Sequence, residues 1–118
     1  MILKNTTPKR GSVALVPFPF TDLSGAKVRP AVVVSEKLKG ADVILIFISS
    51  ITKNQNGFDV LISEKSSDFK KTGLKTESLV KCDKIATLEK KVLLGEIGIL
   101  PPNTMQEISK KLKQILGL

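Results

Sequence analysis

Short apolar runs separated by polar, turn-forming segments restrict most strongly what this 118-residue chain can fold into. Runs rich in Val and Ile cover residues 11–18, 28–35 and 43–48, and each has the length of a β-strand. The run at 43–48 is apolar throughout, which is typical of a strand buried on both faces. Residues 58–63 alternate between apolar and polar side chains and predict a shorter strand. Turn formers at 21–27 predict an exposed hairpin loop between the first two strands.

The second half of the chain predicts a loop, further strand-like pieces and one helix. Residues 64–75 are charged and predict a loop with room for a helical turn, while 77–88 predict two short strands joined around Asp83. Residues 92–100 fit either a strand or a turn. Thr104, followed three residues later by Glu107, matches a helix capping box. Apolar side chains then recur at helical spacing and predict a face that packs in the core or in a dimer: Met105, Ile108, Leu112, Ile115 and Leu116.

The order of these elements predicts the fold class. Five or more short strands followed by one amphipathic helix indicate a mainly β protein with a C-terminal helix, a small antiparallel barrel on which the helix packs. We expect residues 1–118 to form one domain. No apolar run reaches the roughly 20 residues that span a bilayer, and the N-terminus turns polar after three residues, so no secretory signal is expected. The single cysteine, Cys82, excludes an intrachain disulfide and favours a soluble protein of the reducing cytoplasm.

The charge is positive along the whole chain. Lys and Arg number 19 against 11 Asp and Glu, which gives a net charge of +8. Division after Asp59 leaves 8 basic and 4 acidic residues, then 11 and 7, so each half carries +4. A surface that is basic throughout favours a polyanionic partner, chiefly nucleic acid, although solubility alone also explains it.

Missing residue types narrow the chemistry further. The chain has no histidine, which excludes a His-pair ribonuclease, a Ser-His-Asp triad and any His-based zinc site. Catalysis must therefore use Arg, Lys, hydroxyl and carboxylate groups. Trp and Tyr are also absent, so platforms for stacking single-stranded bases are few.

Three blocks of sequence, together with the closing helix, carry a resemblance to a known family. Residues 10–35, RGSVALVPFPFTDLSGAKVRPAVVVS, contain a Gly-led strand, a polar loop, the pair Arg29-Pro30 and a Val-rich strand. The second block is IFISSITK, a hydrophobic strand that ends in hydroxyl residues, and the third is Lys81-Cys82-Asp83 followed by IATL. With them, nearly the whole chain resembles the MazF/PemK toxins of type II toxin–antitoxin systems.

The resemblance implies both a fold and an activity. The fold is a small SH3-like antiparallel barrel of the MazF/CcdB kind that forms a homodimer. The activity is that of an mRNA interferase, an endoribonuclease that cuts single-stranded RNA at short sequences without a metal or other cofactor. The implied partner is an acidic antitoxin protein whose flexible tail lies over the RNA-binding groove.

The candidate catalytic residues follow from chemistry and from the resemblance together. Arg29 carries a planar guanidinium that suits a phosphorane, although a surface ion pair explains an arginine equally simply. In the family the catalytic Arg occupies this Arg-Pro pair. It cannot act as a base, because it stays protonated. The second catalytic residue of the family falls at Ser49, with Ser50 as the alternative, unless these hydroxyls only cap the strand end.

Lys81 and Asp83 are two residues apart, so on a strand they face the same side. Asp83 is the candidate proton acceptor and Lys81 a candidate RNA contact, with a surface salt bridge as the simple alternative. Cys82 between them is expected in the core and not as a nucleophile. The other candidate RNA contacts are loop residues whose polarity solvation alone also explains: Thr21, Lys27, Thr52, Lys53 and Gln55.

Two rival functions stay open on the sequence. A related toxin family uses the same barrel to inhibit DNA gyrase and has no nuclease activity. In that family gyrase binding depends on the C-terminal helix and an aromatic residue there, whereas this chain ends in Gly117-Leu118 without one. The third candidate is a non-catalytic basic RNA-binding module, which the scarcity of aromatic residues disfavours.

Overall fold

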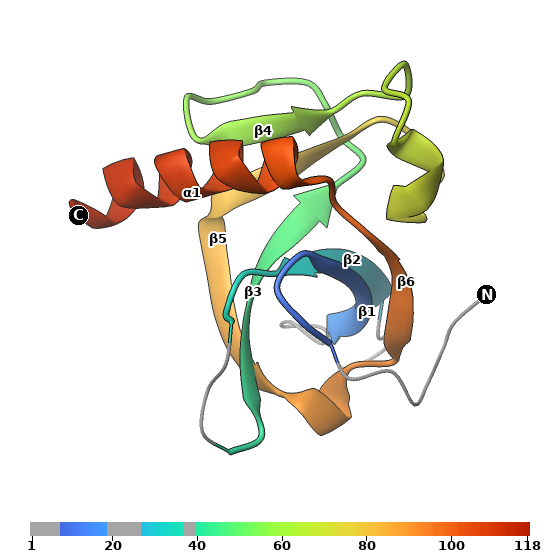
Figure 1. The fold of residues 1–118 in the computed structure, drawn as a ribbon, viewed down its shortest axis with the longest axis vertical. Coiled ribbons are helices and arrows are strands. Elements are labelled where there is room, and N and C mark those ends of the chain that lie inside the picture. Colours follow the sequence, from blue (N-terminus) through green and yellow to red (C-terminus); the bar gives the residue numbers. More distant parts are fainter. Residues whose placement is uncertain (1–7, 19–26, 37–39) are drawn as a thin grey trace.

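Six strands form one antiparallel sheet in the computed structural model, which describes residues 8–18, 27–36 and 40–118 (Figure 1). The elements follow the chain in this order: β1 (Ser12–Phe18), β2 (Lys27–Val33), β3 (Asp42–Ser49), β4 (Asp59–Ile62), the 3-10 turn η1 (Phe69–Thr72), β5 (Ser78–Glu89), the 3-10 turn η2 (Lys90–Val92), β6 (Gly95–Ile99) and helix α1 (Pro102–Leu116). Hydrogen bonds order the strands β4-β5-β3-β2-β1-β6. The sheet curls into a half-barrel, and α1 packs against β4 and β5 (Figure 1). The expected fold class, mainly β with a C-terminal helix, is confirmed.

The interior holds two hydrophobic clusters that follow from the strand patterns. The larger one joins buried residues of β1 to β5, such as Val13 and Ile46, to Met105 and Ile108 of α1, and Ile97 of β6 packs against it. The smaller one forms around Val16, Ala31, Val33, Val43 and Leu45. In β3 every apolar residue is buried or half-buried, and the adjacent Leu45 and Ile46 are both fully buried, as expected for a strand covered on both sides.

Two expectations about element boundaries are wrong. Residues 78–89 form one strand and not two. The first residues of β5 pair with both β4 and β3, and the rest pairs with β3 alone, so the strand continues although its pairing with β3 shifts register between Ile46 and Ile48. The helix begins at Pro102 with Pro101 as its N-cap, and no side chain caps it. Proline is preorganised for the first helical position, so the helix starts earlier and the capping box at Thr104 does not form.

The apolar face of α1 is buried only toward its N-terminal end. Met105 and Ile108 are buried, Leu112 and Ile115 pack against the core, and Leu116 is 56% exposed. The guanidinium of Arg10 ties the helix to the sheet by donating to the Val34 carbonyl (2.6 Å) and to Ser109 Oγ (2.7 Å). Among the helices in the described part of the chain, none is long and apolar enough to cross a membrane.

Candidate functional site

A groove of about 830 Å³ lies between the start of β2 and the loop that follows η1. Its polar and basic lining residues are Lys27, Arg29, Ser50, Lys75, Thr76 and Ser78. Its apolar lining residues are Leu15, Val28, Pro30, Ile48, Leu74 and Ile97. Aliphatic surface of this kind accepts a flat base, and cations at the rim accept a phosphate. We name residues 73–78 the loop wall and residues 27–30 the β2 wall.

The β2 wall extends beyond the part of the strand that pairs with β3. All of Lys27–Val32 pairs with β1, but the pairing with β3 covers only Ala31–Val33. Pro30 has no N–H to donate to a neighbouring strand, which explains why the pairing of β2 with β3 ends at Ala31. Arg29 therefore lies half-buried on the open side of the groove, two residues before fully buried Ala31.

The end of β3 separates the two candidate hydroxyls. The Oγ of Ser49 accepts a hydrogen bond from the Ile51 amide (3.1 Å), which makes the turn that ends the strand. Ser50 is exposed and lines the groove together with Arg29. Of these two serines, Ser50 alone is a lining residue of this groove.

The loop wall is anchored at its start by two glycines. Gly73 has a φ of +74°, and a Cβ there would collide with the Ile97 carbonyl. A Cβ at Gly98 would collide with the backbone of Thr72. The hydroxyl of Thr72 donates to the Phe69 carbonyl (2.6 Å) and accepts from the Leu74 amide (3.2 Å). This close approach fixes η1 against β6.

Hydrogen bonds also anchor the far end of the loop wall. Thr76 Oγ1 and the Glu77 amide both donate to Glu64 Oε1, each at 2.9 Å. These two bonds, the backbone one first, hold the pKa of Glu64 below its ordinary value of 4.5. Ser78 Oγ donates to the Thr76 carbonyl (2.8 Å). The wall is thus held at both ends before any ligand binds.

The candidates on β5 lie away from the groove lining. Lys81 Nζ donates to Asp59 Oδ2 at 3.0 Å, and the side chain of Asp59 is 1% exposed. Asp83 is exposed in the stretch where the pairing of β5 with β3 shifts register. Cys82 is buried, as expected, and burial raises the pKa of its thiol to about 11, with Asp59 and Asp83 adding to the shift and Lys111 opposing it.

The loop candidates divide in the same way. Lys27 lines the groove, whereas Thr52, Lys53 and Gln55 are not lining residues. Lys53 and Gln55 are exposed and Thr52 is half-buried. Thr21 lies outside the described residues.

The sequence did not single out Lys75, Thr76 or Ser78. Residues 64–75 look like a solvated charged loop, and only the fold brings this loop back over β2. The one local feature of the sequence that could have indicated this return of the loop is Gly73, because glycine permits the left-handed backbone turn that redirects the chain there. In the described parts of the chain, no three His, Cys, Asp or Glu side chains lie close enough together to hold a metal ion.

A curled six-stranded antiparallel sheet, one C-terminal helix and a basic groove beside the second strand define a class of small toxin. The sequence model described as PemK-like, MazF-like toxin of type II toxin–antitoxin systems matches residues 9–116. The chain therefore belongs to this family, as its resemblance predicted. The family is known for endoribonucleases.

Solved structures share the fold over almost the whole chain. A mycobacterial endoribonuclease in complex with its cognate antitoxin is 27% identical, with a TM-score of 0.73 over 95% of this chain and 97% of that one. MazF from Deinococcus radiodurans is 19% identical, with a TM-score of 0.76 over 97% and 100% of the two chains. The Mycobacterium tuberculosis toxin MazF-mt6 is 16% identical, with a TM-score of 0.70 over 91% and 97%. No curated protein sequence matches the chain.

Proposed function

We propose that this protein is a metal-independent endoribonuclease toxin that cleaves single-stranded RNA, chiefly mRNA, within the groove beside β2. The observation that carries the proposal is that Arg29 and Ser50, from two different strand ends, line one groove in a chain of this family. The net charge of +8 supports a polyanionic substrate.

The reaction uses the nucleophile that RNA itself supplies. The 2′-oxygen forms a bond to phosphorus, the bond from phosphorus to the 5′-oxygen breaks, and the products carry a 2′,3′-cyclic phosphate and a 5′-hydroxyl. Arg29 stabilises the phosphorane charge and donates a hydrogen bond to the departing 5′-oxygen, because its fork fits phosphate oxygens, and that oxygen takes up a proton from water to become the 5′-hydroxyl. Ser50 orients the reacting groups through its hydroxyl.

The 2′-hydroxyl proton needs an acceptor. Asp83 stays our candidate, which requires the reacting 2′-hydroxyl to come within hydrogen-bond distance of its carboxylate, directly or through one water. Lys81, two residues before it, is a candidate RNA contact. Lys27 binds the RNA backbone on the β2 wall, and Thr21, Thr52, Lys53 and Gln55 are further candidate RNA contacts. Ser49 stays the alternative to Ser50 as the catalytic hydroxyl. The aliphatic lining of the groove offers contact area to the bases.

The proposal includes two protein partners and a compartment. The first is an acidic antitoxin that would cover the basic groove, and the mycobacterial endoribonuclease of similar fold, which is in complex with its cognate antitoxin, supports a partner of this kind. A second copy of the chain would complete a homodimer. Since mRNA is the proposed substrate, we place the protein in the cytoplasm.

The test is cleavage of a long single-stranded RNA by the pure protein in EDTA, compared with Arg29→Ala. We expect the wild type to release fragments with 5′-hydroxyl ends and the variant to be slower by about 10²–10³-fold. Lys113→Ala, a change on the exposed part of α1, is the control that removes a charge without touching the groove. Asp83→Asn in the same assay decides whether that carboxylate accepts the proton.

Other results would favour other functions. If both the wild type and Arg29→Ala leave the RNA intact, and the wild type blocks supercoiling by DNA gyrase, the protein is a gyrase inhibitor. Binding of RNA without cleavage would indicate the non-catalytic RNA-binding module. Cleavage that requires magnesium would show that the Arg29-centred mechanism is wrong.

A further inference from the structure

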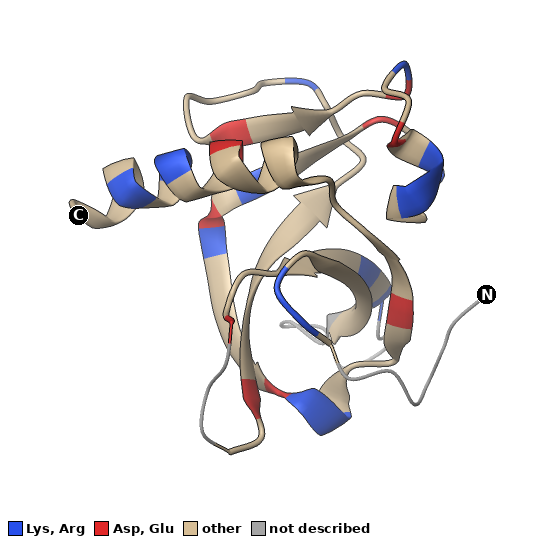
Figure 2. Cartoon of the chain, viewed as in Figure 1, with Lys and Arg blue, Asp and Glu red and all other residues tan. Residues whose placement is uncertain are grey.

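We propose that Lys75 is a phosphate-binding residue of the groove, which holds a second backbone phosphate from the loop wall while Arg29 holds the reacting one from the β2 wall. This inference rests on the proposed function. Lys27 and Arg29 both belong to β2, so Lys75 is the cation that a different segment of the chain adds to the lining. Basic segments on both β2 and η1 are visible in Figure 2.

The charge of Lys75 is available to a ligand. Across residues 8–18, 27–36 and 40–118, the ion pairs of lysines involve Lys71, Lys81 and Lys91, and Lys75 forms none. The loop wall itself contains one carboxylate, that of Glu77, whose Oε1 accepts from the Glu64 amide (3.4 Å) and which forms no ion pair with Lys75. An exposed ammonium that pairs with no carboxylate of the described residues attracts a phosphate at little desolvation cost.

The backbone that carries Lys75 is held in place before binding. Gly73 and Thr72 fix the residues before it against β6, and the bonds from Thr76 and Glu77 to Glu64 fix the residues after it. RNA binding therefore has to order the lysine side chain but not the loop. A preformed site of this kind retains more of its interaction energy as affinity.

The chemistry of lysine determines what the residue contributes. An ammonium is a point charge with rotatable donors, so it binds a phosphate without reading the base beside it. Lys75 should strengthen binding to all single-stranded sequences alike and leave the reacting phosphate to Arg29. Its loss should raise KM and leave kcat unchanged.

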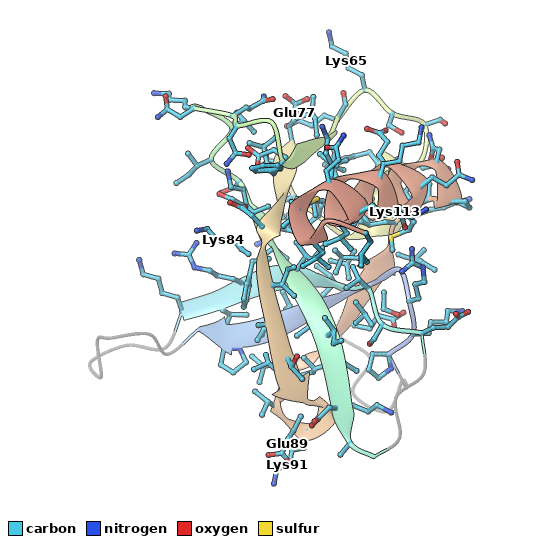
Figure 3. The ribbon with its side chains drawn as sticks, turned by 90° about the vertical axis from the view of Figure 1, so that its left-hand side faces the viewer. Lys65, Glu77, Lys84, Glu89, Lys91 and Lys113 are labelled. Carbon is cyan, nitrogen blue, oxygen red and sulfur yellow. The ribbon has the colours of Figure 1, made fainter. Side chains whose placement is uncertain are left out.

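The experiment measures RNA binding across a salt series for the wild type, Lys75→Gln, Lys75→Arg and Lys65→Gln. The probe is a single-stranded oligonucleotide of randomised sequence with 2′-O-methyl groups, which cannot be cleaved through the 2′-oxygen. Lys65→Gln is the matched control, because it removes the same charge from an exposed side chain that points away from the body of the protein (Figure 3). Cleavage of ordinary RNA is followed in parallel to separate KM from kcat.

We expect Lys75→Gln to weaken binding about fivefold at 0.1 M salt and to reduce the slope of log K against log salt by about 0.7. Lys75→Arg should restore both values, and Lys65→Gln should keep the wild-type slope. If Lys75→Gln binds like Lys65→Gln while the wild type cleaves RNA, this inference is wrong and the proposed function stands. If the wild type neither binds nor cleaves RNA, both are wrong.

Discussion

Ser49 and Ser50 show how much one position matters at the end of a strand. Ser49 is the last residue of β3 and Ser50 is the first residue after it, so the two adjacent serines meet different surroundings. Ser49 closes the turn by accepting from the Ile51 amide, and Ser50 lines the groove with Arg29. The sequence left these two hydroxyls as alternatives, and their surroundings favour Ser50 as the partner of Arg29.

Single substitutions separate the two serines. We expect Ser50→Ala to slow RNA cleavage by about 10²-fold, because one hydroxyl donor directed at the developing charge contributes about that much. Ser50→Thr should retain most activity, since it keeps the hydroxyl. The measurement is kcat for a fluorescent RNA substrate.

Ser49→Ala is the matched variant. It should keep its cleavage rate and lower the free energy of unfolding by about 1 kcal/mol, the contribution of one hydrogen bond. Greater loss of activity in Ser49→Ala than in Ser50→Ala would contradict the assignment.

The loop wall, considered as an element, depends on close backbone contact. Gly73 adopts a left-handed φ of +74° while its α-carbon lies against the Ile97 carbonyl. Any side chain there meets both a strained backbone and occupied space. The position of Lys75, Thr76 and Ser78 along the groove follows from that contact.

Replacement of Gly73 by alanine should therefore affect both stability and function. We expect the free energy of unfolding to fall by about 3 kcal/mol, from combined backbone strain and overpacking, and RNA binding to weaken as the wall shifts. Urea denaturation measures the first effect. Gly57→Ala, with no atom within 4 Å of the added carbon, is the control and should stay within about 0.5 kcal/mol of the wild type. Equal stability of the two variants would show that the wall tolerates the displacement.

Element boundaries were predictable where local chemistry decides them. Runs of Val and Ile gave β1, β2 and β3 within a residue or two, because their lengths and turn-forming neighbours are local properties. β5 was predicted as two pieces, since the register shift opposite Phe47 depends on which strand lies beside it. The start of α1 was missed because a proline at the first helical position replaced the expected cap.

At the scale of the whole molecule, charge and groove act together. The charge of +8 is spread over both halves of the chain, and Lys27, Arg29 and Lys75 bring part of it to one groove. A polyanion is attracted by the overall field and retained by these local cations. An acidic polypeptide should therefore compete with RNA for binding in the groove.

Polyglutamate should inhibit RNA cleavage competitively and lose potency as salt rises, because the Debye length falls to roughly 3 Å at 1 M salt. The measurement is the inhibition constant at two salt concentrations. Uncharged polyglutamine of equal length is the control and should not inhibit. Inhibition that is independent of salt, or that lowers kcat with KM unchanged, would show that the acidic chain binds outside the groove.

The sequence by itself determined the strand-then-helix order, the excess of basic residues and the absence of imidazole, and it placed the chain in its family. These properties reside in local patterns and in composition. Only the tertiary structure decided that Ser50 and Lys75 line one groove with Arg29 and that Lys81 pairs with Asp59. Such contacts join residues far apart in the chain, and they depend on the register of neighbouring strands and on a glycine-mediated close approach that no local pattern encodes.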